Sequence, residues 1–221
     1  MSGATLEAAL GCARLVSQWG ALPLLVGVTG HRDLRREDIP RLETEVERVL
    51  DGIAERAAGE LIVVVSALAE GADRLVASVG VGRGCRLVAA LPMSPEVYEE
   101  DFETEESREE FRRLLNRADR WFAVSEGRVD DPAGDRVLCY ALAGAWLVWN
   151  CRALIALWDG LETGKAGGTS EVVRYAREGV PGDLAALLGG SEGDGLNGRG
   201  GVVVHHIPTP RASGVEPRAG A

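Results

Sequence analysis

Five short apolar segments, each followed by a helix-like stretch, constrain the fold of this chain more than any other feature. They are Leu24–Gly30, Leu61–Leu68, Cys85–Pro92, Arg120–Ser125 and Ala153–Gly160. Their runs of Val, Ile, Leu and Ala are nearly continuous, which is typical of strands that are buried on both faces. Alternation of strands and helices predicts a mainly parallel sheet with right-handed crossovers. The predicted fold class is therefore α/β, a three-layer sandwich around that central sheet.

The stretches between the strands carry helical periodicity or helix-start signals. Apolar residues recur on one face of one stretch, and in two others a capping residue stands before a proline. A glycine and a threonine precede the last of them. The expected helices are Ile39–Ala58, one that begins at Ser94-Pro95, one that begins at Asp131-Pro132 and runs through Trp149, and Ser170–Glu178.

We expect one domain over residues 1–207 and a disordered tail over 208–221. A chain of 221 residues, of which 46% are hydrophobic, can bury a sizeable single core. Val202–Ile207 is predicted to add a sixth strand at one edge of the sheet, after a flexible glycine-rich loop over Gly189–Gly201. Met1–Gly20 is expected to form an amphipathic helix rather than a signal peptide.

Charge, hydropathy and cysteine usage exclude several classes of function. No apolar run reaches the roughly 18 residues that a membrane helix needs, so no membrane partner is expected. A formal net charge of −10 argues against nucleic acid as a partner, since non-specific binding relies on Lys and Arg. The four cysteines form no C-x-x-C pair, and no histidine stands at ligand spacing from them. We therefore expect reduced thiols, a cytoplasmic protein, and neither a metal nor a cofactor.

Polar residues follow the first and second strands, at the edge where an open parallel sheet binds its ligands. Glycine lets the backbone turn or approach a ligand, while hydroxyl, imidazole and guanidinium groups suit phosphate or ribose. An ordinary turn explains the first loop as well, and the acids of the second can instead cap a helix. The candidate binding residues in these loops are Thr29, Gly30, His31, Arg32, Ser66, Glu70, Gly71 and Asp73.

A glycine-rich loop after the fifth strand is the strongest phosphate-binding signal in the chain. The segment Gly164–Glu171 leads into a predicted helix, whose first N–H groups favour an anion. It is not a Walker A loop, because Lys165 precedes the final glycines instead of following them. The candidate binding residues here are Asp159, Gly160, Gly167, Gly168, Thr169 and Glu171.

These loops resemble the SLOG superfamily, which includes DNA-processing protein A and the lonely-guy phosphoribohydrolases. The resemblance lies in VGVTGHRDL, VVSALAEGADRLVA, LPMSPEVYEEDF, LIALWDG and GGTSEVVRYAR, and it spans roughly residues 24 to 178. It implies a Rossmann-like fold that binds nucleotides or their derivatives. Lonely-guy enzymes use a P-G-G-x-G-T-x-x-E loop, which this chain matches only partly. Val172 stands where the family has its glutamate, and Glu171 comes one residue earlier.

Three functional hypotheses remain open from the sequence. The first is binding or sensing of a nucleotide-like, phosphate-bearing small molecule by the three loops. The second is hydrolysis of the N-glycosidic bond of a nucleoside monophosphate, with Glu171 or Glu70 as general acid or base. The third is an interaction domain without a ligand. The tryptophans over Trp146–Trp158 fit a core as well as the face of a homo-oligomer.

Overall fold

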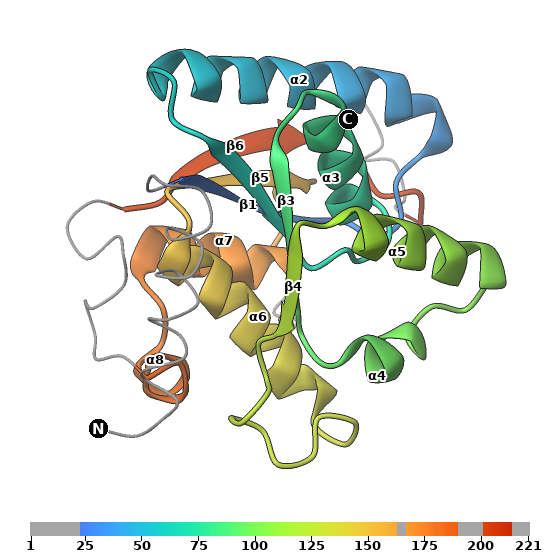
Figure 1. The fold of residues 1–221 in the computed structure, drawn as a ribbon, viewed down its shortest axis with the longest axis vertical. Coiled ribbons are helices and arrows are strands. Elements are labelled where there is room, and N and C mark those ends of the chain that lie inside the picture. Colours follow the sequence, from blue (N-terminus) through green and yellow to red (C-terminus); the bar gives the residue numbers. More distant parts are fainter. Residues whose placement is uncertain (1–22, 163–166, 190–200, 214–221) are drawn as a thin grey trace, which may run out of the picture.

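The strands of the described part of the chain lie in one sheet, in which every pair of neighbours is parallel. The computed structural model describes residues 23–162, 167–189 and 201–213. The strand order is β4-β3-β2-β1-β5-β6 (Figure 1). The strands are β1 (Leu24–Gly30), β2 (Ile62–Ser66), β3 (Arg86–Leu91), β4 (Arg120–Ala123), β5 (Ala153–Trp158) and β6 (Val203–Pro208). The predicted α/β fold is confirmed, and each of the strands β1 to β5 lies within its predicted segment.

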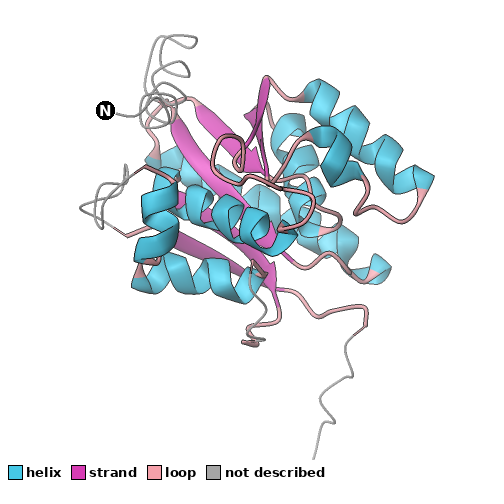
Figure 2. Ribbon diagram, turned by 90° about the horizontal axis from the view of Figure 1, so that it is seen from below, coloured by secondary structure: helices cyan, strands magenta, loops and turns pink. Residues whose placement is uncertain are grey.

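Helices cover both faces of this sheet, as Figure 2 shows from a second direction. One layer holds α2 (Ile39–Arg56), α3 (Ala72–Gly82), α4 (Pro95–Glu99) and α5 (Glu105–Arg117), with the short 3-10 helix η1 (Arg36–Asp38) before them. The other layer holds α6 (Arg136–Asn150), α7 (Thr169–Glu178) and α8 (Gly182–Leu187).

Both helix layers pack against the same strands, which explains why the apolar runs of these strands are continuous. In β2, Val64 packs into the core beneath α2 and α3, whereas Val63 and Val65 pack into the core beneath α6 and α7. All three side chains are fully buried. Because successive side chains of a strand point to opposite faces, a sheet covered on both sides needs apolar residues at every position.

Helix α6 begins later than the sequence predicts. Asp131 accepts a hydrogen bond from the N–H of Gly134 at 3.0 Å and so closes a turn. The helix starts at Arg136, where the Asp135 carboxylate caps it by accepting from the N–H of Leu138 at 3.2 Å. The Asp-Pro pair that we expected to open the helix lies in the preceding turn.

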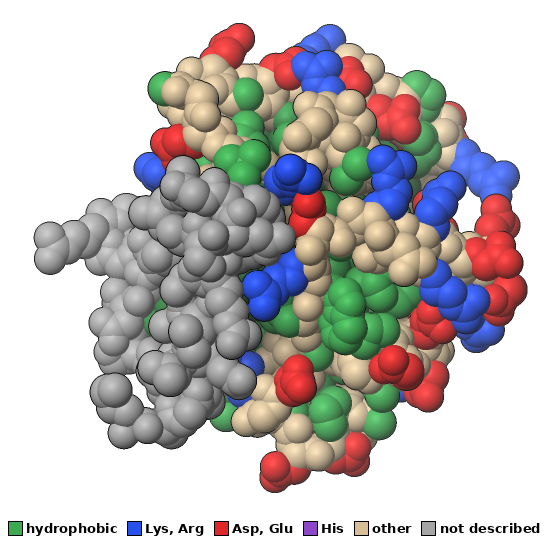
Figure 3. All heavy atoms as spheres, in the orientation of Figure 1, with side chains coloured by type: hydrophobic (Ala, Val, Ile, Leu, Met, Phe, Trp, Pro, Cys, Tyr) green, Lys and Arg blue, Asp and Glu red, His purple; other side chains and the backbone are tan. Residues whose placement is uncertain are grey.

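The acidic stretch over residues 96–110 forms α4 and the first half of α5, and most of its carboxylates are exposed. Figure 3 shows acidic and basic side chains interspersed over this side of the molecule. Arg112, for example, contacts Glu99 and Glu105, each at 2.7 Å. Such exposed pairs contribute little stability, so the stretch serves as a solvated helix surface.

The C-terminal segment corrects the predicted tail. Strand β6 lies at the edge of the sheet, as predicted, but it extends to Pro208. Residues 209–213 are packed against the loop after β1 instead of being disordered, and Thr209 is fully buried. The predicted N-terminal helix, most of the loop Gly189–Gly201 and residues 214–221 lie outside the described residues. Within the described ranges, no helix combines the length and apolarity needed to cross a membrane.

Candidate functional site at the carboxyl edge of the sheet

A cavity of about 550 Å³ surrounds the carboxyl end of β1. The strand order reverses here, because β2 lies on one side of β1 and β5 on the other. A crevice at such a switch point is the usual ligand site of an open parallel sheet. The walls come from the loops after β1 and β2 and from α4, α6, the start of α7 and the C-terminal segment.

Three loops that are far apart in sequence meet at this cavity. Thr29 and Thr169 line the same space, although 140 positions separate them in the sequence. Gly164–Ala166, the first part of the glycine-rich loop, falls outside the described residues. The predicted residues that line the cavity are Thr29, Gly30, His31, Arg32, Asp73, Gly167, Gly168 and Thr169.

Three predicted residues of the second loop lie beside the cavity without lining it. The Ser66 hydroxyl is buried; it donates to the Asp73 carbonyl at 3.1 Å and accepts from the N–H of Leu68 at 3.0 Å. The Glu70 carboxylate accepts a hydrogen bond from Ser107 and lines a different cavity, of about 520 Å³, against α5. Gly71 packs against the backbone of the loop after β1. These residues shape the β2–α3 turn.

The predicted residues that follow β5 also make their contacts with other residues of the protein. Asp159 accepts from the N–H of Leu161 at 3.0 Å and lies beside His31. Gly160 follows it and is not among the lining residues. The Glu171 carboxylate accepts from the N–H of Gly167 at 2.5 Å and contacts Arg174 at 3.1 Å. Glu171 thereby holds the glycine loop against α7.

Close packing explains the glycines of these loops without a ligand, because a Cβ at each position would clash with a neighbour. A Cβ on Gly30 would lie 2.4 Å from the Cβ of Ala72, and one on Gly71 would lie 2.4 Å from the carbonyl oxygen of Arg32. A Cβ on Gly167 would lie 2.5 Å from the Cβ of Tyr140. Glycine at these three positions is therefore not by itself evidence for a ligand.

Arg32 is the exposed cation of the cavity. Its guanidinium lies over the ring of Tyr140, 5.3 Å from the centroid. Among the described residues, no carboxylate oxygen lies within the 4.0 Å of an ion pair with it. Burial alone would lower the pKa of Arg32, but the oxygens of Tyr98, Tyr140 and Asp101 raise it above its ordinary value. Arg32 therefore presents a permanent, unpaired positive charge to the cavity.

A network between α4 and α6 forms the wall beside Arg32, and the sequence analysis did not find it. Asp101 accepts from Arg136 at 2.7 Å and from the Tyr140 hydroxyl. Arg136 also contacts Glu100 at 2.6 Å. Burial, followed by the bond to Asp101, raises the pKa of Tyr140 to about 12. The one available signal was the four-residue spacing of Arg136 and Tyr140, which places both on one face of a helix.

His31 is 2% exposed and links the ends of β1 and β5. Its Nε2 accepts a hydrogen bond from the N–H of Asp159 at 3.0 Å, and the Asp159 carboxylate lies 3.3 Å away. Burial and then the charge of Arg211 lower the pKa of His31, while Asp159 and Asp33 oppose the shift. The ring is therefore neutral at pH 7. Because Nε2 accepts, we assign the proton to Nδ1.

Asp73 is a buried acid that lines the cavity from the first turn of α3. It is 6% exposed. Burial raises the pKa of Asp73 to about 7, against the opposing effects of Arg32, the N–H groups of Ala69 and Ala67, and Arg74. A carboxyl group with such a pKa is partly protonated near neutral pH, so it can both donate and accept a proton.

Two buried polar atoms of the cavity lining have no hydrogen-bond partner among the described residues. They are the Nδ1 of His31 and the hydroxyl oxygen of Tyr98, whose side chain is fully buried. An unsatisfied buried donor costs about 1–3 kcal/mol, which a ligand acceptor would recover. Two unsatisfied donors therefore belong to residues that line the cavity, and both atoms are buried.

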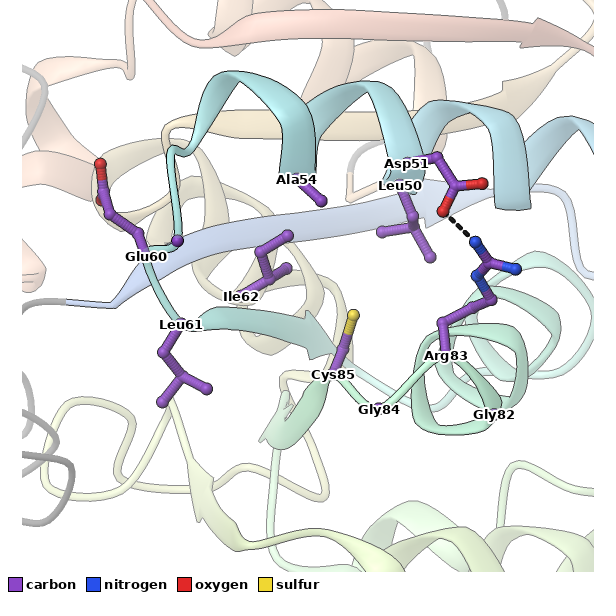
Figure 4. Close-up of a pocket in the computed structure, with 11 residues that line it drawn as sticks. Leu50, Asp51, Ala54, Glu60, Leu61, Ile62, Gly82, Arg83, Gly84 and Cys85 are labelled. Carbon is purple, nitrogen blue, oxygen red and sulfur yellow. Dashed lines mark hydrogen bonds and ion pairs between the residues drawn. The ribbon is translucent and has the colours of Figure 1, made fainter.

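A third cavity, of about 630 Å³, lies at the opposite, amino edge of the sheet. Figure 4 shows the Cys85 side chain pointing toward the space between α2 and β2, with the Asp51–Arg83 ion pair at its rim. Burial raises the pKa of the Cys85 thiol, which disfavours the reactive thiolate. Within the described ranges, no group of three or more His, Cys, Asp or Glu side chains is placed to hold a metal ion.

The fold and the cavity define a Rossmann-like α/β protein with a polar site at the switch point of its sheet. No family model matches the chain, and no curated protein sequence matches it. Among solved structures, it is similar to DNA processing protein A (DprA) from Streptococcus pneumoniae, with 13% sequence identity and a TM-score of 0.39. The match covers 74% of this chain and 61% of that one, so it spans less than two thirds of that protein. At this TM-score, the likeness carries no functional argument.

Proposed function

We propose that the cavity at the carboxyl edge binds a small anionic molecule that bears a phosphate group, of the nucleotide type. The observation that carries the proposal is the guanidinium of Arg32, which lines the cavity without an ion pair from the described residues. An arginine in such a position is suited to a phosphate, since its planar fork donates two parallel hydrogen bonds. Gly168 and Thr169, at the start of α7, line the same cavity.

The size and polarity of the cavity support this ligand class. Its volume of about 550 Å³ falls within the range of small-molecule sites, roughly 300–1,000 Å³. The unpartnered Nδ1 of His31 and hydroxyl of Tyr98 can donate to ligand oxygens, and Asp73 can accept from a sugar hydroxyl. The resemblance of the loop sequences to the SLOG superfamily points to the same nucleotide-derived ligands.

The test is calorimetric titration of the protein with AMP, ADP, GMP, CMP and ribose 5-phosphate. We expect at least one of them to bind below millimolar concentration. Arg32→Gln should weaken that binding by about tenfold or more, the loss of one charge-assisted hydrogen bond. Arg48→Gln, an identical charge change at an exposed position of α2, is the matched control. No binding of any compound, or equal binding by Arg32→Gln, overturns the proposal.

A second candidate function is hydrolysis of the N-glycosidic bond of such a ligand, and the raised pKa of Asp73 favours it. Glu70 and Glu171, the catalytic candidates from the sequence, do not line the cavity, and both carboxylates are bound elsewhere. Incubation with AMP tests the reaction by release of free adenine. Release that Asp73→Asn abolishes and Glu171→Gln retains supports an enzyme with Asp73 as acid or base. Binding without release supports a sensor.

A further inference from the structure

The five residues after β6, Thr209–Ser213, form a short segment that folds against the loop after β1. The N–H of Thr209 donates to the Trp158 carbonyl at 2.9 Å, and the N–H of Ala212 donates to the Asp33 carbonyl at 2.8 Å. Arg35 donates from Nε to the Arg211 carbonyl at 3.0 Å, and Leu34 and Arg211 form an antiparallel bridge. The backbone of this segment is thereby fixed beside the cavity from both ends.

The side chain carried by this segment, Arg211, lines the cavity. It touches two carboxylates, and both contacts are long: 3.5 Å from Nη1 to Asp33 and 3.5 Å from Nε to Asp159. Arg136, which also lines the cavity, is bound much more closely, at 2.6 and 2.7 Å to Glu100 and Asp101. A charge-assisted hydrogen bond of normal strength measures about 2.7–2.9 Å, so neither carboxylate holds Arg211 firmly.

We propose that the segment Thr209–Ser213 completes the candidate site and that Arg211 is a specificity-determining residue, which contacts the anionic part of the ligand together with Arg32. This inference rests on the proposed function, because it assigns a second cation to the same cavity. Two arginines from separate elements can bind more than one oxygen of a phosphate group. The long contacts to Asp33 and Asp159 allow Arg211 to turn toward the ligand at small cost.

Arg211 also contributes to the protonation state of His31, the buried histidine of the site. Charged groups face His31 from each element around it: Asp33 from its own loop, Asp159 from the end of β5 and Arg211 from the C-terminal segment. Burial is the main cause of the lowered pKa of His31, and Arg211 adds to it against the two carboxylates. A neutral ring with Nε2 as acceptor has its donor at Nδ1. Arg211 is in this respect a positioning residue for His31.

The binding experiment compares the wild-type chain with Arg211→Gln, Arg211→Lys and the control Arg48→Gln, using AMP and ribose 5-phosphate as probes. We expect Arg211→Gln to weaken binding by about tenfold, Arg211→Lys to recover part of the loss, and Arg48→Gln to bind like the wild type. If the wild type binds and Arg211→Gln binds equally well, the inference is overturned while the proposed function stands. If the wild type binds neither probe nor the wider nucleotide panel, both fall.

A measurement without ligand tests the effect of Arg211 on His31. The chain contains only three histidines, so the signals of their rings can be followed by NMR from pH 4.5 to 8. The variant His31→Gln identifies which of these signals belong to His31. We expect Arg211→Gln to raise the pKa of His31, because the positive charge that lowers it is removed while Asp33 and Asp159 remain. His205, whose pKa burial and Arg56 lower, should not respond and is the internal reference. An unchanged His31 titration overturns the positioning role of Arg211 toward His31.

Discussion

Arg74 donates a hydrogen bond from Nε to the carbonyl oxygen of Leu68 at 3.0 Å, across the turn between β2 and α3. Leu68 has a φ of 57°, in the left-handed region that side chains other than glycine rarely adopt, and it is fully buried. Arg74 is itself 2% exposed and also bonds to the backbone of Ser107 at 2.9 Å. One arginine thus fixes the turn whose residues Ala67 and Ala69 line the cavity.

Replacing Arg74 with methionine is expected to lower the free energy of unfolding by about 2–4 kcal/mol. Methionine keeps an unbranched apolar side chain at this buried position, but the guanidinium over the Phe102 ring is lost and the carbonyls of Leu68 and Ser107 lose their donors. Urea unfolding measures the change. Arg113→Met, on the exposed side of α5, is the control and should stay within about 0.5 kcal/mol of the wild type. A similar small effect from Arg74→Met would contradict the structural role.

The second prediction separates steric contact from backbone strain at glycine. Gly71 has a φ of 74°, and an added Cβ would lie 2.4 Å from the Arg32 carbonyl oxygen. Gly84 has a similar φ of 82° with nothing within 4 Å of an added Cβ. We expect Gly84→Ala to cost about 1 kcal/mol, the cost of the left-handed backbone, and Gly71→Ala at least about 2 kcal/mol more.

Thermal and urea unfolding of both glycine variants provide the comparison. Since the clash at Gly71 displaces the backbone of His31 and Arg32, Gly71→Ala should also weaken nucleotide binding, whereas Gly84→Ala should leave it unchanged. Equal stability of the two variants would show that the loop after β1 accommodates the added Cβ without loss of stability.

The third prediction concerns the pH dependence that Asp73 imposes on stability. Burial raises the pKa of Asp73 to about 7 in the folded chain, above its ordinary value of 3.8. The folded state therefore retains a proton that the unfolded state has lost, and stability falls as the pH rises from about 4 through about 7, by at most about 1.4 kcal/mol per pH unit. Urea unfolding from pH 4.5 to 8 measures the free energy of unfolding of the wild type and of Asp73→Asn. The difference between the two should show this slope. A difference that does not vary with pH would refute it.

His31 should have the opposite effect on stability. Burial and Arg211 lower the pKa of His31 below 6.5, so in acid the unfolded state binds a proton that the folded state does not. Stability is then lost as the pH falls below about 6.5. In the same titration, His31→Gln should be less sensitive to acid than the wild type. Greater acid sensitivity of the variant would mean that the ring is charged in the folded protein.

The fold was largely predictable because it depends on a local pattern. Val63, Val64 and Val65 are β-branched and apolar in succession, and such a short run is typical of a strand covered on both faces. Helix starts were less predictable, since Asp131 and Asp135 both precede apolar residues and either can cap a helix. The choice between them depends on how the turn after β4 packs, and the sequence pattern does not contain that information.

The candidate site was predicted only in part. Thr29, Arg32 and Thr169 were found because each follows or precedes an element at the expected edge of the sheet. Tyr98, Tyr140 and Arg211 were missed, because tyrosines inside helices and an arginine in a terminal segment carry no local signature. Glu70 and Glu171 were chosen for their chemistry, and their side chains turn to Ser107 and Gly167 instead.

The sequence by itself determined that this chain forms a parallel, two-sided sheet with glycine-bearing loops at one edge, since residue type and spacing are local properties. Only the tertiary structure decided which loop side chains face a common cavity, that Asp73 is buried there, and that Arg211 returns to it from the end of the chain. Those outcomes depend on the packing of α4, α6 and the C-terminal segment around β1. The burial and the electrostatic environment of a site depend on all the residues around it, and the chain brings these residues together only when it folds.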